Sequence, residues 1–594
     1  MKDIRLIVFI TIALFSIIDC GGGSGNTSRS STTGGNTTTP VVTWGADKIT
    51  VGSPYNKMLQ FSQYGTLVLI NAPKGMAIYP NGTVVWTPTR NQVGTYTVTA
   101  KIQGNANIVE SKIFTVDVLD KALSYNGVFI DLSGVKGRLG TPSSPYGTYK
   151  EACVNLNGLQ NIYIRGGVYK NPGYHIDYTK NGRYPAIDIQ CQGTLNKPLV
   201  IRPWGNEYVK LKTDALSGIR VKKGAKYITI ENFEIEGESQ SINLNTALQY
   251  WWWDTNDTMQ SSAIVTNGDH LTIRNNTIHD MPGSGISVVG GAYATIEGNV
   301  VYNCDWWTIA GSKGIGITQA VDDTVNPANG AYKNKIVGNL IFNIEQRLFS
   351  HVWGKGFATL TIDEGEAFLI QEGKQVSGST STSYTGKYLL KDNLLIYNGK
   401  TGVINLAKDV NVTNNSYYNN GTATKQSAFR VNTSTNVNFS NNAIESNISN
   451  TLIYSIAKNS LSNVFFANNY AKGVVQRNGV PILGIISKNK VFNDPQNLDF
   501  NVSIGIPMGV GISKTALDNI KQKIALFHIN VTNNHLDVNK TAMRDYVINN
   551  APLGTTIDYT HFNDIINPYV VIRNMPNSHP SVKATGSKNF TLYL

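Results

Sequence analysis

The chain has 594 residues, of which 41% are hydrophobic and 15% are charged, and its formal net charge is +12. This length is enough for several domains, and the abundance of Gly, Asn, Ser and Thr favours β structure with tight turns over helix. Lys and Arg form no dense cluster, so nucleic acid is not the expected partner. The positive charge suits an acidic glycan or an anionic surface.

Residues 1–20 predict an export signal. A basic start precedes an apolar run over 6–18, which is too short to span a bilayer, and no other run is long and apolar enough to do so. Cys20 follows, and the arrangement resembles the processing site of bacterial lipoproteins, although Asp19 departs from the small residue preferred there. The resemblance implies an outer-membrane or cell-surface protein that meets the membrane only through a lipid on Cys20. Ordinary secretion is the alternative.

Two short regions come next. Residues 21–40 are almost wholly Gly, Ser, Thr and Asn, which predicts a flexible linker. Residues 41–120 alternate apolar and polar positions in short runs, such as 83–86 and 95–99, which predicts a small β-sandwich. This region resembles bacterial cadherin-like, immunoglobulin-type modules, which implies a spacer, with a sugar-binding accessory as the alternative. The resemblance rests on segments 72–76, 82–89 and 94–100.

A repeat of the form apolar-x-x-Asn-apolar begins near residue 125 and predicts one coil of a parallel β-helix per copy. Stacked strands bury Ile, Val and Leu, and the Asn side chains form a ladder along the turns. Copies lie at 273–278, 296–301, 336–341, 390–395, 412–415, 439–442 and 466–469, with a shortened one at 228–233.

Segments 140–152 and 162–169 resemble the opening of exported right-handed parallel β-helix proteins, including polysaccharide lyases, in which a short helix caps the first coil. Segments 492–495, 499–500 and 507–511 resemble their closing part. We therefore expect an all-β chain with a right-handed parallel β-helix over 121–513. The sandwich precedes it, and a short C-terminal α/β extension over 514–594 follows, with a helix at 514–527.

Three cysteines, Cys153, Cys191 and Cys304, follow the signal, and their spacing matches no zinc motif. A Cys153–Cys191 disulfide is one outcome for an exported protein. Burial of all three as small unpaired side chains is the outcome that we favour.

The candidate site is expected in the middle coils. Ladder positions are closely spaced after Asn393, but the intervals 232–276, 299–339 and 339–393 are long, which predicts functional loops. These intervals hold most of the tryptophans, whose faces suit sugar rings. The predicted substrate-binding residues are Trp252, Trp306, Trp307, Trp353 and Lys355. Asp280, after His279, is interpreted as part of a structural turn.

Segment 363–374 concentrates carboxylates, which repel one another unless a cation intervenes. A Ca²⁺ site is therefore expected, with Glu364, Glu366 and Glu372 as ligands. Its Glu-x-Glu followed by a lysine resembles the metal-and-base region of alginate and chondroitin lyases, which implies Lys374 as the base that removes the C5 proton, with His351 as the alternative base. The following coil, 402–406, supplies no arginine, so the assisting role passes to Arg347, His351 or Lys355.

Three functions remain open, and all assume a monomer. The first is a polysaccharide lyase that cleaves an acidic, uronate-containing glycan by β-elimination. The second is an inverting glycoside hydrolase in which Asp323 and Glu364 flank the bond. The third is a non-catalytic surface adhesin or glycan-binding protein.

Overall fold

A computed structural model defines the fold in two units, residues 1–121 and 122–594, which are considered one at a time. The described residues are 47–62, 65–89, 92–103, 110–119, 125–133, 138–171, 185–249, 257–309, 312–349, 351–352, 357–359, 362, 365–372, 384–422, 429–448, 454–456, 463–472, 476–477, 480–481, 485–486, 490–550, 556–558 and 569–571.

The first unit is the predicted small β-sandwich. One sheet has the order β1-β7-β6-β3 and the other has the order β2-β5-β4. Alternate residues of β6, including Val98 and Ala100, point into a core that contains Trp86 and Phe114. The strands are β1 (Asp47–Thr50), β2 (Tyr55–Met58), β3 (Thr66–Ile70), β4 (Ala77–Ile78), β5 (Thr83–Trp86), β6 (Gly94–Gln103) and β7 (Ser111–Leu119).

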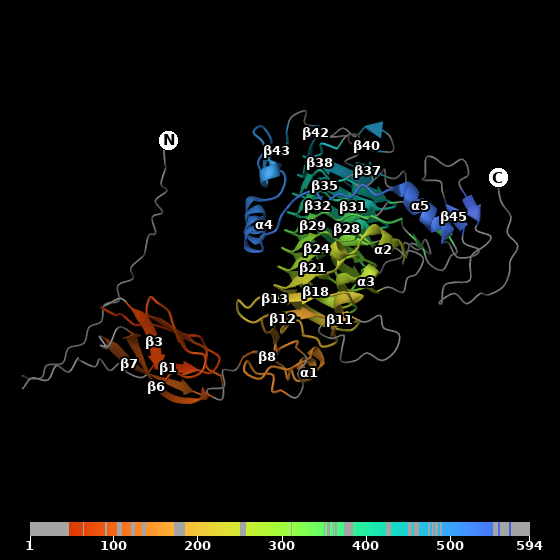
Figure 1. Cartoon of the computed structure of the whole chain (residues 1–594). Helices are drawn as coiled ribbons and strands as arrows, with labels where there is room; N and C mark the ends of the chain where they lie inside the picture. The colour runs from red at the N-terminus through yellow and green to blue at the C-terminus, as the bar shows by residue number, and fades with distance from the viewer. Residues whose placement is uncertain are drawn as a thin grey trace, which may run out of the picture. The chain divides into compact units, whose positions relative to one another are not determined.

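The second unit is the predicted parallel β-helix, built from three long parallel sheets that the chain visits in turn (Figure 1). Sheet 1 comprises β8 (Gly127–Ile130), β9 (Asn161–Ile164), β12 (Leu199–Pro203), β15 (Lys226–Glu231), β18 (Asp269–Arg274), β21 (Ala294–Glu297), β24 (Tyr332–Val337), β29 (Lys387–Lys391), β32 (Lys408–Thr413), β35 (Thr435–Ser440) and β38 (Val464–Ala467).

Sheet 2 comprises β10 (Gly167–Lys170), β13 (Val209–Lys212), β16 (Glu234–Glu236), β19 (Thr277–His279), β22 (Val300–Tyr302), β25 (Leu340–Phe342), β30 (Leu394–Ile396), β33 (Ser416–Tyr418), β36 (Ala443–Glu445), β39 (Tyr470–Lys472) and β42 (Ile485–Ile486). Sheet 3 comprises β11 (Pro185–Ile189), β14 (Ser217–Val221), β17 (Ser262–Thr266), β20 (Ile286–Val289), β23 (Lys313–Thr318), β28 (Glu366–Gln371), β31 (Lys400–Asn405), β34 (Phe429–Asn432) and β37 (Tyr454–Ile456).

The asparagine ladder runs along the turns between sheets 1 and 2. Asn299 is fully buried; its side-chain amide donates to Ile273 O at 2.9 Å, and its oxygen accepts from Asn276 N at 3.0 Å. The turn residue before each ladder position has a left-handed backbone, and in two coils it is a glycine, Gly298 or Gly338. The ladder therefore satisfies buried turn backbone from coil to coil. Its members are Asn276, Asn299, Asn339, Asn393, Asn415, Asn442 and Asn469.

The first coil is capped by α1 (Tyr149–Val154), as the sequence predicts. Thr148 caps the helix by accepting a hydrogen bond from Glu151 N. Cys153 on α1 forms a disulfide with Cys191, so the expectation of three unpaired cysteines is wrong. Helix α1 packs against the first coils, which brings two cysteines that are 38 positions apart in sequence to a Cα separation of 5.3 Å. Cys304 is buried and unpaired.

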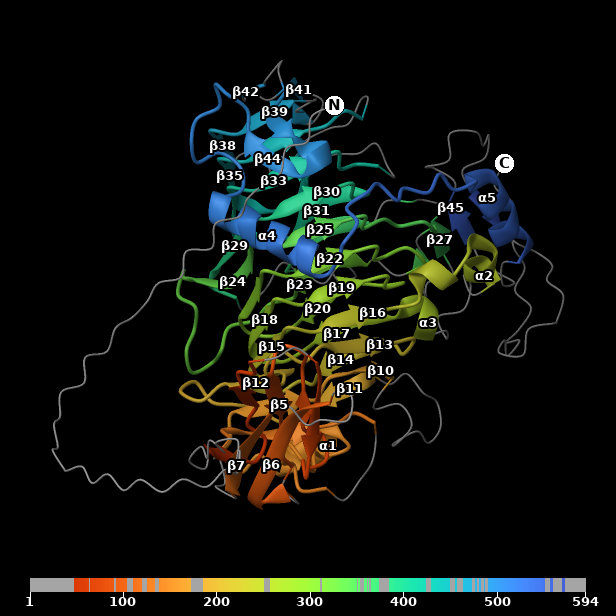
Figure 2. The same cartoon turned by 60° about the vertical axis from the view of Figure 1, so that its left-hand side comes forward.

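The C-terminal part covers the outer face of sheet 2 in the later coils. Helix α4 (Lys514–Leu526) starts at the capping residue Ser513 and inserts Leu517 and Ile520 among outward-facing residues of sheet 2, including Val300 and Leu340. The helix lies on one side of the solenoid, and α5 (Lys540–Asn549) lies on the other (Figures 1 and 2). Within the described residues, no helix combines the length and apolar character needed to cross a membrane.

Long connections border both edges of sheet 3. Connections 237–261, 303–312 and 343–365 enter its strands from sheet 2, and connections 319–331 and 372–386 leave them for sheet 1. Because the strands are parallel, all the entering connections lie along the side of the sheet where its strands begin. All the leaving connections lie along the side where its strands end. The irregular middle coils therefore surround one sheet.

The elements outside the three sheets are short. In and around the long connections they are η2 (Ser239–Ser241), α2 (Leu244–Gln249), α3 (Asp257–Gln260), β26 (His351–Val352) and β27 (Phe357–Thr359). Near the C-terminus they are β40 (Gln476–Arg477), β41 (Val480–Pro481), β43 (Phe492–Asp494), η4 (Pro495–Asn497), β44 (Asp499–Val502), β45 (Thr556–Asp558) and β46 (Tyr569–Val571).

Candidate functional site

A row of alternating charge lies where three neighbouring strands of sheet 3 begin. Lys313 is in register with Glu366, and Glu366 is in register with Lys400. The three residues are 8%, 1% and 3% exposed. Neighbouring strands are about 4.8 Å apart, so the row places one carboxylate between two ammonium groups. In the earlier coils the same row holds Ser217 and Ser262.

The Lys313 side chain runs along the outer face of sheet 3. Ile315 and Ile317 point into the core, whereas Gly316 faces outward beneath the lysine. A Cβ atom at Gly316 would lie 2.7 Å from Lys313 Cε, so the lysine needs a glycine there. The row therefore belongs to the face that the long connections border.

Glu366 is the first residue of β28, and Glu372 directly follows its last residue. Both are buried, and Phe368 and Ile370 between them point into the core as predicted. Six extended residues span about 20 Å, whereas Ca²⁺ binds oxygen at about 2.3–2.6 Å. The prediction that both glutamates bind one calcium ion is therefore wrong. The third predicted ligand, Glu364, lies outside the described residues.

Arg347 lies in a buried clasp. Its Nε donates to Glu345 Oε2 at 3.0 Å, its guanidinium stacks 3.4 Å from the centre of the Trp306 ring, and a second guanidinium nitrogen donates to Asn534 O. Burial lowers the pKa of Arg347, and the charge of Glu345 opposes that effect. Because these contacts engage the guanidinium, we reassign Arg347 from an assisting catalytic residue to a residue that holds the connection 343–365.

Trp306 and Trp307 do not present open faces to a sugar. They are 4% and 3% exposed, and they pack in a cluster that includes Met543 and Val547 of α5. Their indole nitrogens donate to Asn343 O and Ser239 O at 3.1 and 2.9 Å. The prediction that these two rings bind substrate is corrected to a packing role beneath the long connections.

The remaining predicted site residues cannot be placed by their side chains. His351 is the first residue of β26, and only its backbone is described. Lys374, Trp252, Trp353 and Lys355 lie outside the described residues.

The acidic pair proposed for a hydrolase is only half defined, because Glu364 is not described. The carboxylate of Asp323 pairs with His270 Nε2 at 2.6 Å, and backbone hydrogen bonding, mainly from Val325, together with His270 lowers its pKa. Its neighbour Asp322 accepts from Thr385 Oγ1 at 2.6 Å and so ties two exit connections of sheet 3 together. Both aspartates already serve to order these connections.

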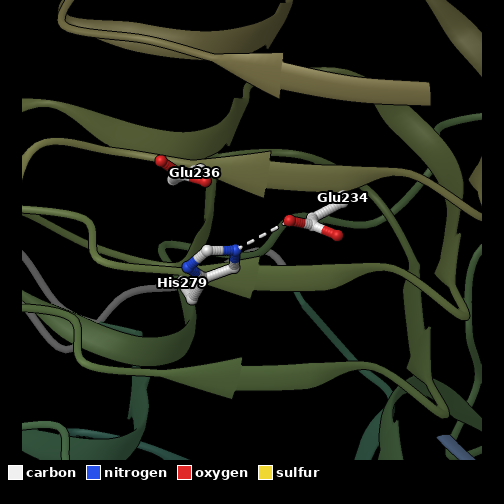
Figure 3. A group of neighbouring side chains, drawn as sticks. All are labelled: Glu234, Glu236 and His279. Carbon is white, nitrogen blue, oxygen red and sulfur yellow. Dashed lines mark hydrogen bonds and ion pairs between the residues drawn. The ribbon is translucent and has the colours of Figure 1, made fainter. Parts of the chain in front are cut away.

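Sequence reasoning missed a charged cluster on the outer face of sheet 2. Ligand atoms of Glu234, Glu236 and His279 lie within 4.8 Å of one another (Figure 3). His279 Nε2 lies 3.2 Å from Glu234 and its Nδ1 lies 2.8 Å from Asp280, while Lys210 Nζ lies 2.6 Å from Glu234 and also contacts Glu236.

The charged groups of this cluster pair with one another. Burial alone would lower the pKa of His279, but hydrogen bonds to Asp280 and Glu234 outweigh it and raise the pKa to about 9. Burial would raise the pKa of Glu234, but hydrogen bonds from His279, Lys210 and Tyr208 lower it to about 2. A metal ion here would have to displace both the His279 proton and the Lys210 ammonium, which lies between the two carboxylates. With the proton and the ammonium in place, the cluster contains its own cations.

The sequence repeat did not reveal this cluster, because the predicted register of the coil that contains Asn232 was wrong by one residue. The sequence repeat places Asn232 on the ladder, but in the structure Phe233 occupies that position and Asn232 is the left-handed residue before it. With this register, Glu236 lies directly opposite His279. Asp280 has a left-handed backbone and bonds to Asn303, as its interpretation as a turn residue requires.

Comparison with known proteins identifies the N-terminal module. A family model described as a putative Ig domain matches residues 25–119, in agreement with the predicted immunoglobulin-type module. No curated protein sequence matches the chain.

Among solved structures, the chain is similar to the A-module of the mannuronan C-5 epimerase AlgE4 from Azotobacter vinelandii, with 13% identity, 61% of this chain and 100% of that chain covered, and a TM-score of 0.32. The pectate lyase Pel9A is 13% identical, the match covers 64% of this chain and 90% of that chain, and the TM-score is 0.38. A rhamnogalacturonan lyase is 12% identical, the match covers 61% of this chain and 85% of that chain, and the TM-score is 0.34. At these values the matches carry no argument about fold or substrate, and the β-helix assignment rests on the strand register.

Proposed function

We propose that the β-helix unit binds an acidic polysaccharide over the outer face of sheet 3 and cleaves it by β-elimination. One observation carries the proposal: the buried Lys313–Glu366–Lys400 row lies on the sheet that the long connections border at both edges. Counted by themselves, the two lysines and one glutamate give the row a formal excess of one positive charge. Because burial reduces screening by salt, this charge acts on a ligand more strongly than a surface lysine would.

The chemistry requires a base, charge neutralisation and a leaving group. Loss of the C5 proton of a uronate to a base builds negative charge on the C6 carboxylate, and the field of the row opposes that charge. The C4–O bond then breaks, the departing oxygen takes up a proton, and a C4=C5 double bond forms. Lys374 remains our candidate base. No step is assigned to calcium, because the described carboxylates do not converge on one ion.

The experiment supplies the purified mature protein with a panel of uronate polymers and follows ultraviolet absorbance and reducing ends together. Absorbance that rises with the reducing ends supports elimination. Reducing ends without absorbance replace the proposal with the inverting hydrolase, and binding without either signal replaces it with non-catalytic glycan recognition. Export and lipidation at Cys20 are part of the same proposal, because a polysaccharide substrate is extracellular.

A further inference from the structure

A groove with both apolar and polar lining lies on another part of the β-helix unit, between helix α4 and the turns that join sheet 1 to sheet 2. Its volume is about 1240 Å³. Asn519 and Gln522 of α4 line one wall, Asn232 and Asn275 of the stacked turns line the other, and Tyr208 precedes β13 at one end. We call it the turn-edge groove.

Lys523 fixes the wall formed by α4. Its Nζ donates to Asn275 Oδ1 at 2.8 Å and to the carbonyl oxygen of Gly298. A Cβ atom at Gly298 would lie 2.8 Å from the same Asn275 oxygen and 3.1 Å from Lys523 Nζ, so the glycine makes room for this contact. The groove is thus held open by a specific anchor between two elements that are far apart in sequence.

The exposed groups in the groove match the chemistry of sugar hydroxyls. Each carboxamide offers both donors and an acceptor, and a hydroxyl group also does both. The Tyr208 ring is 49% exposed, and its phenol is held in place by a 2.7 Å hydrogen bond to Glu234. An aromatic face fixed in this way suits the C–H face of a pyranose ring. The exposed carboxamides are those of Asn206, Asn232, Asn275, Asn519 and Gln522.

The charge of the lining does not favour acidic glycans. The lining contains four carboxylates and two basic residues, Lys523 and His528, and the Lys523 ammonium already binds protein oxygens. Glu207 and Glu234 are paired with Arg165 and Lys210, so the groove offers a uronate no free ammonium group comparable to the lysines of the row on sheet 3. The four carboxylates are those of Glu207, Glu234, Glu297 and Asp392.

We propose that the turn-edge groove is a separate, non-catalytic binding site for a neutral oligosaccharide. The inference goes beyond the proposed cleavage activity and does not depend on it. It rests on Tyr208, the carboxamides and the fixed α4 wall, none of which belongs to sheet 3.

Affinity electrophoresis of the full mature chain in gels that contain a neutral β-1,4-glucan, β-1,3-glucan or mannan tests this proposal, with polygalacturonate as the acidic probe. We expect retardation by at least one neutral polymer. Tyr208→Ala and Gln522→Ala should each weaken that binding roughly tenfold or more, whereas Tyr208→Phe keeps the ring and should retain most of it. Tyr332→Ala is the matched control, because Tyr332 is 39% exposed on sheet 1, outside the groove.

Thermal unfolding of each variant shows whether a loss of binding is a loss of folding. The proposal is overturned if no neutral polymer retards the wild-type chain, or if Tyr208→Ala binds as the wild type does while its melting temperature is unchanged. Loss of polygalacturonate binding in Tyr208→Ala would also overturn it, because the groove would then belong to an acidic-glycan site. The cleavage assay is read separately, so failure at sheet 3 leaves this result intact.

Discussion

His535 hydrogen-bonds through Nδ1 to the buried carboxylate of Glu345, although 190 positions separate the two residues. The same carboxylate accepts from Arg347 Nε at 3.0 Å and from the backbone N–H of Leu536 at 3.3 Å. The C-terminal segment is thereby tied to the connection 343–365, which enters the strand that carries Glu366. A region with no repeat of its own helps to fix the border of the proposed site.

This clasp predicts a pH dependence of stability. The hydrogen bond to Glu345 raises the pKa of His535 above its ordinary value of about 6.5, and partial burial opposes the rise. A histidine with a raised folded-state pKa contributes stability that is complete below about pH 6.5 and is lost as the pH rises through the folded-state pKa. His535→Gln should therefore unfold at a lower temperature than the wild type near pH 6, and the two should converge near pH 9.

Thermal unfolding across that range measures the difference between the two proteins. Charges around the imidazole include Asp537, Glu345 and Arg347, and all are present in both proteins. The raised pKa of His279 acts equally in both and cancels. His528→Gln, at an exposed position of the same segment, is the control. A constant offset between wild type and His535→Gln at every pH would contradict the prediction.

A second prediction concerns Lys210. Its ammonium lies between Glu234 and Glu236, so Lys210→Met leaves two carboxylates beside His279 with one cation fewer. The two carboxylates are hard oxygen ligands, and the histidine completes a set that suits Zn²⁺ once it loses its proton. The variant should therefore melt at a higher temperature in excess Zn²⁺, whereas the wild type should not respond.

The comparison is made at constant ionic strength with Lys212→Met, which removes a more exposed lysine that contacts Glu236 alone. Equal responses of wild type and Lys210→Met to the metal would show that the ammonium does not block the site. A response of Lys212→Met as large as that of Lys210→Met would show that general charge is responsible.

The repeat made the solenoid predictable because the asparagine in each coil marks the positions of the neighbouring strands. An asparagine buried at each turn is required to satisfy backbone groups, so its position recurs in the sequence and marks the strands beside it. The copy at Asn232 lacks that asparagine, since Phe233 takes its place, and the prediction there slipped by one residue. The Glu236–His279 pair was lost with it, because one residue moves a side chain to the other face of a strand.

The candidate site was less predictable because its determinants are tertiary. Trp306 and Trp307 are buried by Met543 and Val547, which come from a helix more than two hundred positions away in the chain. Glu366 was singled out for its neighbours in sequence, whereas its structural neighbours are Lys313 and Lys400 on adjoining strands. Loop length between the coils sets those neighbours, and no periodic signal reports it.

A third prediction tests the ladder. The Asn339 side chain donates to Ile296 O at 3.0 Å and accepts from Asn299 N at 2.8 Å, and it is fully buried. Asn339→Ala leaves buried backbone groups on two coils without partners, at a cost of about 3 kcal/mol. We expect the melting temperature of the β-helix to fall by roughly 5 °C. Asn438→Ala, on the half-buried outer face of sheet 1, is the control, and an equal loss there would contradict the prediction.

The last prediction separates two roles for Glu366 by variants of opposite charge. If the row acts through its net charge, Lys400→Met removes the positive excess and should weaken binding and cleavage of a uronate polymer by roughly tenfold or more. Glu366→Gln keeps the shape of the side chain and removes its negative charge, which raises the net charge of the row by one. This variant should therefore bind the polymer at least as tightly as the wild type.

If Glu366 instead holds a cation that neutralises the substrate, Glu366→Gln must lose activity, because a neutral amide is a weaker ligand. Lys400→Arg keeps the charge, and Lys408→Met removes a lysine that is 67% exposed on sheet 1, so both serve as controls. Loss of activity in Glu366→Gln with an unchanged melting temperature would reject the electrostatic role of the row and return Glu366 to the metal site that its sequence context predicts.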